Sequence, residues 1–200
     1  MEGALFYWFC WMFWIGVYFF MEKGKKRTTY SVLILCLLIL ASLEIQVFGH
    51  SISVGFILCL LIGYVLLTSV RLRNQFYFLV VSLILAFAGI SFQLFEIFDP
   101  VIILFDRSWM LGLLYSALVL ALVSDRTKRI PVFIVGACQG EIVITHFLQT
   151  IYVEQTIGHL LFFDAFVVTI FLLFIWYSFE VLTEMVSKKV LEKSQREVGV

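Results

Sequence analysis

Ionisable side chains interrupt several long apolar runs of this chain, and these residues are the first candidates for chemistry. A charged side chain at the centre of a bilayer is costly, so its retention is a reason to expect function. Glu141 falls near the middle of its apolar run, whereas Glu44, His146 and Asp164 fall nearer one end of theirs. Carboxylate and imidazole groups held together in an apolar surrounding can pass protons or bind a metal ion.

Polar residues from four apolar runs are expected to meet in one outward-facing cavity. The expected members are Glu44, Gln46, Gln93, Glu96, Glu141, His146 and Asp164. One use of such a cavity is structural, because buried polar groups hydrogen-bond helices together, usually by less than ~1 kcal/mol each. A second is transport or proton relay, with Glu141 carrying the proton and His146 as its partner toward the outside. A third is the binding of a divalent metal ion.

Metal binding and catalysis have little support in the sequence. His146 and His159 are the candidate metal ligands beside Glu141 and Asp164, but no H-x-x-x-H or H-E-x-x-H pattern places two ligands on one helix face. The four cysteines stand singly, and no G-x-S-x-G sequence occurs. No catalytic residue, enzymatic activity or cofactor is therefore predicted.

The composition indicates what surrounds these residues. Apolar residues make up 62 % of the 200-residue chain and charged residues only 14 %. Soluble domains, in contrast, are roughly half apolar and a quarter charged. Most of the chain is therefore expected to lie in lipid. The formal net charge is zero, so no basic field attracts nucleic acid, and nucleic-acid binding is not expected.

The distribution of Lys and Arg predicts how the chain crosses the membrane. All but one of these 14 residues fall into four short clusters, at every second gap between apolar runs. The clusters lie within residues 23–27, 71–73, 126–129 and 188–196, and only Arg107 lies elsewhere. Because cytoplasmic loops retain positive charge, the clusters mark the inner face of the membrane. The amino terminus is then outside and the carboxyl terminus inside, which requires an odd number of crossings.

Seven transmembrane helices are predicted, since a helix needs about 20 residues to cross the hydrocarbon layer. The predicted spans are 3–21, 29–48, 51–70, 76–95, 101–123, 131–150 and 158–179. Residues 1–182 thus form an all-α polytopic bundle in the cell membrane, and residues 183–200 form a short charged cytoplasmic tail. The fifth span has two alternative starts. A helix that begins at Val101 lets Arg107 reach outward to the surface, whereas a start at Ser108 leaves residues 101–105 in the interface.

The sixth span is the least lipid-like, and it is expected in the middle of the bundle. Residues 136–141 read Gly-Ala-Cys-Gln-Gly-Glu. Gly136 and Gly140 form a G-x-x-x-G face, which lets another helix approach closely. This face is the expected packing surface of the span.

An aromatic first span and a basic loop characterise the start of the chain. The residues concerned are Met1-Glu2-Gly3, Phe6-Tyr7-Trp8, Trp11, Trp14 and the cluster at 23–27. In these residues, in its length and in its hydropathy profile, the chain resembles the YphA family of Bacillus and its relatives. The resemblance implies a multi-pass protein of the cell membrane. It implies no established activity and assigns no functional residue.

Two functions are compatible with these features. The first is a membrane interaction or assembly component, which binds other membrane proteins or a second copy of itself through close helix faces such as Gly136 and Gly140. The alternative is a small permease or ion-coupled carrier that uses Glu141 and His146. The lipid bilayer is the partner that both functions require.

Overall fold

Helices make up most of the computed structural model, which describes residues 2–47, 49–68, 72–99, 101, 103–150 and 156–198. Side chains are described for these residues except 72–74 and 190–198. The elements in this part of the chain are α1 (Ala4–Phe20), α2 (Lys25–Leu40), β1 (Glu44–Val47), β2 (His50–Ser53), α3 (Val54–Thr68), α4 (Leu72–Phe98), α5 (Arg107–Leu122), α6 (Arg129–Gln149) and α7 (Leu160–Val198).

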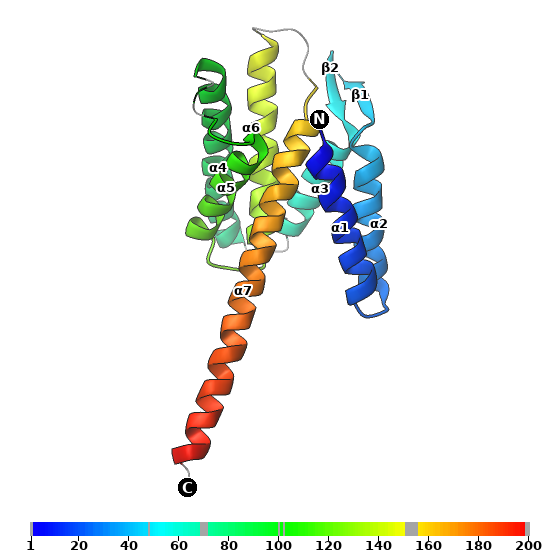
Figure 1. Ribbon diagram of the computed structural model, residues 1–200. Helices are drawn as coiled ribbons and strands as arrows, with labels where there is room; N and C mark the ends of the chain where they lie inside the picture. Colours follow the sequence, from blue (N-terminus) through cyan, green and yellow to red (C-terminus); the bar gives the residue numbers. More distant parts are fainter. Residues whose placement is uncertain are drawn as a thin grey trace.

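Two helices, α6 and α7, organise the bundle (Figure 1). α6 packs along α4 and against α3, while α7 packs along α5 and against α1. In the membrane-length part of each helix, 67 % of the residues of α6 are buried, compared with 50 % for α7 and 33 % for α4. The prediction that this glycine-containing helix lies in the middle of the bundle is therefore confirmed.

Small residues explain how α4 and α6 come close together. A Cβ atom added to Gly136 would lie 2.8 Å from the Leu85 Cβ and 2.8 Å from the Ser82 carbonyl oxygen. A Cβ atom on Gly140 would lie 3.0 Å from the Ala86 carbonyl oxygen. Both glycines thus face α4, and the G-x-x-x-G face is used for packing inside the chain.

Aromatic rings fill the seam between α1, α6 and α7. The ring of Phe6 lies 5.0 Å from that of Phe163, and Phe9 lies 4.7 Å from Phe171. Phe133 of α6 lies 5.2 Å from Phe166 of α7. Since lipid is as apolar as these rings, their contribution is close packing and not transfer out of water.

The prediction of a second span over 29–48 is wrong beyond Leu40. α2 ends there, and residues 44–47 and 50–53 form an antiparallel hairpin in which Glu44 pairs with Ser53 and Val47 with His50. Polar and apolar residues alternate in β1, as in a strand with two different faces. Gly49 has a φ of +83°, which permits the tight turn between the strands. As a result, α3 begins at Val54 and not at the predicted residue 51.

The predicted start of the fifth span at residue 101 is also wrong. α5 begins at Arg107, close to the alternative start at Ser108. Asp106 caps the helix, because its carboxylate accepts hydrogen bonds from the backbone N–H groups of Ser108 at 3.0 Å and Trp109 at 3.4 Å.

Among the residues that the structure describes, three helices are long and apolar enough to cross a membrane. They contain the segments Gln75–Phe98, Arg129–Gln149 and Leu160–Lys189. The apolar helices α1, α3 and α5 are shorter, with 17, 15 and 16 residues. α7 has 39 residues and is therefore about 58 Å long, so it projects well beyond the other helices (Figure 1). It runs without a break through residue 183, where the predicted tail begins.

An ion-pair network ties α7 to the connection between α5 and α6. The Arg126 Nε lies 2.7 Å from a carboxylate oxygen of Glu180, and its Nη2 lies 2.7 Å from Glu184. Arg129 also binds Glu180, at 3.0 Å. In the same connection, the Thr127 hydroxyl donates to Asp125 at 2.8 Å, which lowers the pKa of that carboxyl. The third basic cluster thus meets acidic residues of α7 at the end from which this helix projects.

Candidate functional site

Four elements bring polar side chains together at the end of the bundle where α7 begins. Gln93 and Glu96 lie three residues apart on α4, so they share one face near the end of that helix. Arg107 is the first residue of α5, and Glu141 lies in the second half of α6. His159 precedes α7 by one residue. Each residue is placed by a helix or by a helix end, so the positions are set by the packing of the bundle.

Arg107 joins α5 to α4. Its Nε lies 2.6 Å from a carboxylate oxygen of Glu96, and its Nη2 donates to the side-chain oxygen of Gln93 at 3.1 Å. The guanidinium therefore points into the bundle toward α4. A helix that begins at Val101 was expected to let it reach outward to the surface instead. A cation at the start of a helix is disfavoured by the helix dipole, so the Glu96 carboxylate also offsets that unfavourable position.

Glu141 is the most deeply buried acid of the site. Its carboxylate oxygen Oε1 lies 3.2 Å from the Nδ1 of His159 and accepts a hydrogen bond from the Thr145 hydroxyl at 3.5 Å. The Glu141 side chain is 2 % exposed, whereas that of His159 is 32 % exposed. His159 thus lies between a carboxylate inside the bundle and the surface of the protein.

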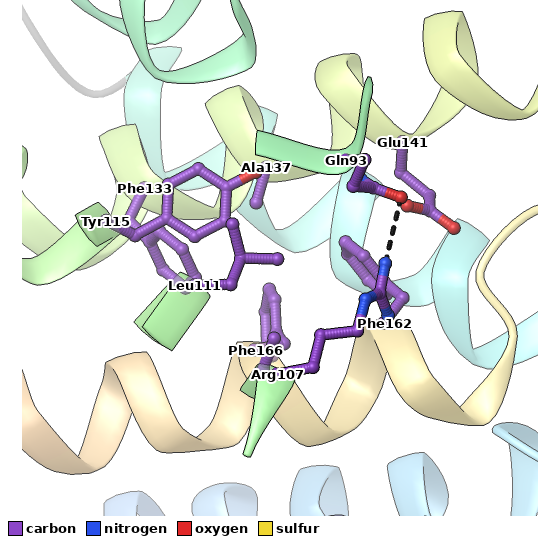
Figure 2. A pocket seen from close by; sticks show the side chains of 10 residues that line it. Gln93, Arg107, Leu111, Tyr115, Phe133, Ala137, Glu141, Phe162 and Phe166 are labelled. Atoms are coloured by element: carbon purple, nitrogen blue, oxygen red, sulfur yellow. Dashed lines mark hydrogen bonds between the residues drawn. The ribbon is translucent and has the colours of Figure 1, made fainter. Parts of the chain in front are cut away.

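Two cavities meet at Gln93 and Arg107. The larger cavity has a volume of about 240 Å³, is open to the surface, and is lined by Glu96, Arg107 and His159 among others. The smaller cavity is enclosed and has room for about one water molecule. Figure 2 shows the smaller cavity, with Gln93, Arg107 and Glu141 on one side, Tyr115 and Phe133 on the other, and Phe162 beside Arg107. We call the four rings that line this cavity, those of Tyr115, Phe133, Phe162 and Phe166, the aromatic wall.

A third, separate crevice lies between α3, α4 and α6. It has a volume of about 180 Å³ and is lined by polar residues including Tyr64, Ser82 and Gln139. The Gln139 amide nitrogen donates to the Tyr64 hydroxyl at 3.1 Å, and the Ser82 hydroxyl donates to the Gln139 amide oxygen at 3.3 Å. Gln139 and Glu141 are two positions apart on α6, so they face opposite sides of the helix. The crevice and the cavities are thus separated by the contact between α4 and α6.

The structure brings three of the predicted cavity residues together and places the others elsewhere. Gln93, Glu96 and Glu141 line the two connected cavities. Glu44 and Gln46 are exposed on strand β1, because the second helix ends before them. His146 is exposed, and its ring lies 5.5 Å from that of His50. The predicted pairing of Glu141 with His146 is therefore wrong, since His159 occupies that position.

Asp164 has a different task, which is to hold the start of α1. Its two carboxylate oxygens accept hydrogen bonds from the backbone N–H groups of Gly3 at 2.9 Å and Phe6 at 2.7 Å. The first N–H groups of a helix have no partner within the helix, and a carboxylate is favoured at that positive end. Asp164 is thus a capping residue supplied by another helix and not a member of the cavity.

We expect Asp164→Ala to lower the stability of the protein by about 2 kcal/mol, because it leaves buried backbone donors without an acceptor. Thermal unfolding of the purified protein in detergent measures this loss. Asp164→Asn is the matched control, since it keeps one acceptor oxygen and should lose less stability. Equal stability of Asp164→Ala and wild type would contradict the capping role.

The candidate metal ligands do not assemble in the described residues. His146 contacts His50, and His159 contacts Glu141. In the part of the chain that the structure describes, no group of three His, Cys, Asp or Glu side chains is placed to hold a metal ion. The chemistry of the site is therefore that of one buried carboxylate, one imidazole and one carboxylate–guanidinium pair.

Two residues of the site, Arg107 and His159, have roles that differ from those expected from the sequence. Arg107 is the single Lys or Arg outside the four basic clusters, and this isolated position could have indicated its role in the site. Thr145 follows Glu141 by four residues and so shares its helix face. His159 lies outside α6, and only the arrangement of the helices in space brings it to Glu141.

Comparison with known proteins agrees with the membrane fold. The model of the YphA-like integral membrane protein family matches residues 2–199. A protein of Bacillus subtilis (strain 168), described as the uncharacterized protein YphA, is 27 % identical over 189 residues, which cover 94 % of each chain. No solved structure matches the chain at a significant level.

Proposed function

The chain belongs to the YphA-like family of integral membrane proteins, and we propose that it is a small carrier that moves a polar solute together with a proton. The observation that carries this proposal is the pair of Glu141 and His159. The carboxylate is inside the bundle, while the imidazole reaches an open cavity. A buried acid is expensive in a membrane unless it serves a purpose, and proton-coupled carriers use such acids as relays.

We also infer that all seven helices cross the membrane, with the amino terminus outside. The positive-inside pattern of the sequence supports this orientation. In Figure 1, the α1–α2 turn and the α5–α6 connection lie toward the end from which α7 projects, while the hairpin lies at the opposite end. Both of these connections carry basic clusters. The cavity with Glu96, Arg107 and His159 would then face outward.

A carrier needs access from both faces and a barrier between them. The proposal assigns the cavity with Glu96, Arg107 and His159 to the outer face and the crevice at Tyr64, Ser82 and Gln139 to the inner face, and these two openings lie on opposite sides of α6. The aromatic wall and the close contact of Gly136 and Gly140 with α4 separate them. Closing one opening and widening the other requires a shift of α4 along α6, and small residues at a helix contact permit such sliding.

The interaction hypothesis loses the face on which it relied. Gly136 and Gly140 contact α4 of the same chain, so they are not available to a second protein. No enzymatic step is part of the proposal.

The test is solute uptake by the purified protein in liposomes. A panel of labelled amino acids, carboxylates and sugars is supplied with and without an inward proton gradient. We expect Glu141→Gln to abolish the part of the uptake that the gradient drives, because the amide cannot exchange the proton. The variant should still fold, since glutamine keeps the shape of the side chain and an acceptor for His159.

Glu44→Gln is the matched control. It removes one carboxylate from the same end of the molecule, but from an exposed strand outside the cavity. Uptake by this variant should equal that of wild type. Proton-driven uptake that is the same in wild type and Glu141→Gln, or no uptake of any solute in the panel, would overturn the proposal.

A further inference from the structure

An apolar groove lies between α1 and α7, away from the polar site. Its lining consists of Met12, Phe13, Gly16, Val17, Phe20, Met21, Phe171 and Phe174. The volume is about 570 Å³, which is within the range of small-molecule sites. The groove is therefore large enough for part of a lipid molecule.

The groove exists because α1 and α7 are in contact at one end and diverge toward the other (Figure 1). Asp164 of α7 holds Gly3 and Phe6 at the start of α1, and the Phe9 and Phe171 rings continue the contact. Beyond these rings the two helices separate. Gly16 adds no side chain to fill the space, and a Cβ atom at this position would meet nothing within 4 Å.

The wide end of the groove leads to a basic turn. Phe20 and Met21 line the groove, and Lys23, Lys25 and Lys26 follow directly in the chain. These three side chains are exposed, and none of them makes an ion pair with a residue that the structure describes. Glu22 is the one acidic residue within this turn. The turn therefore keeps a net positive charge that another molecule can neutralise.

Arg27 is held in a different way. Its Nη1 donates to the Tyr18 carbonyl oxygen at 3.4 Å, and its guanidinium carbon lies 5.1 Å from the centre of the Tyr18 ring. These contacts fix the start of α2 against the end of α1. The lysines are thus presented next to the groove by a turn that is itself anchored.

We propose that the groove and the basic turn together bind one anionic diacyl phospholipid. An acyl chain lies along Gly16 between α1 and α7, and the phosphate of the headgroup lies against Lys23, Lys25 and Lys26. Basic residues beside a gap between membrane helices are a recognised arrangement for anionic headgroups. The inference stands independently of the proposed carrier function, because the groove shares no residue with the polar cavities.

Native mass spectrometry of the full-length protein from mixed phosphatidylglycerol and phosphatidylcholine micelles tests this site. Wild type should retain one phosphatidylglycerol molecule in preference to phosphatidylcholine by about tenfold or more. Gly16→Phe places a ring in the groove from a position where a Cβ atom meets nothing within 4 Å, and it should lose the retained lipid. The triple variant Lys23→Gln, Lys25→Gln, Lys26→Gln should retain the two lipids nearly equally.

The matched charge control is Lys128→Gln, Lys188→Gln, Lys189→Gln, which removes the same number of lysines far from the groove in sequence. It should keep the preference of wild type. Thermal unfolding of each variant in detergent shows that the fold is intact. Retention of phosphatidylglycerol by Gly16→Phe at the wild-type level, or a preference that survives in the first triple variant, would overturn the proposal. Equal retention of both lipids by wild type would also overturn it.

Discussion

Replacing Gly136 with leucine is expected to prevent the bundle from assembling. Even a Cβ atom at this position would lie 2.8 Å from both the Leu85 side chain and the Ser82 backbone, closer than real Cβ contacts. Gly136→Ala should already cost about 1–3 kcal/mol, because overpacking forces the two helices apart. Gly136→Leu adds three more carbon atoms to the same contact and should leave little folded protein. Yield of monodisperse protein in detergent and its thermal unfolding measure both effects.

Gly16→Ala is the control for a glycine in a helix without a close neighbour. A Cβ atom there meets nothing within 4 Å, so the substitution should be neutral or stabilising by up to ~1 kcal/mol from helix propensity alone. If Gly136→Ala were as stable as Gly16→Ala, the close contact of α4 and α6 at Gly136 would be wrong. Loss of partner binding by Gly136→Leu would carry no information about a docking face, because the variant is expected to misfold.

Removing the guanidinium from the polar site is the second change with a large expected effect. Arg107→Leu leaves Glu96 without its cation and Gln93 without its donor. Breaking a buried ion pair in this way lowers the stability of a protein by about 3–5 kcal/mol. We expect Arg107→Leu to lower it by about 2–3 kcal/mol, because each side chain of this pair remains about a fifth exposed. Thermal unfolding in detergent is again the measurement.

The double variant Arg107→Leu, Glu96→Leu tests whether stability is lost because the Glu96 charge is left unpaired or because the Arg107 side chain is missing. An apolar pair of similar volume often replaces an ion pair at no cost, so the double variant should be more stable than Arg107→Leu. Arg126→Leu is the control for a more exposed cation, which pairs with Glu180 and Glu184 outside the polar site, and it should lose less than ~1 kcal/mol. A double variant as unstable as the single one would show that Glu96 contributes nothing through its charge.

The sequence predicted the helices well where packing agrees with hydropathy. The observed bounds of α1 and α6 lie within two residues of the predicted spans. Gly136 and Gly140 correctly indicated a close helix contact. The hairpin was missed because Ile45, Val47 and Ile52 are apolar, so a hydropathy window cannot distinguish a strand from a helix there.

The candidate site was predicted in part, and the reason is geometric. Glu141 stood out because an acid in an apolar run is costly. Its partner His159 did not stand out, although helix periodicity already argued against His146. His146 follows Glu141 by five residues and is therefore rotated about 140° away from it on the helix. His159 and Arg107 reach the site from other elements, and no spacing within the sequence measures such an approach.

The carboxylate that caps α1 has a consequence for how the protein is made. Gly3 and Asp164 are 161 positions apart in the chain, so the ribosome completes the first hydrophobic segment long before it synthesises the acceptor for its opening amides. Until then, those amides must be satisfied by water or headgroups at the membrane surface. We infer that α1, although it is translated well before α7, takes its final position only once α7 is in place.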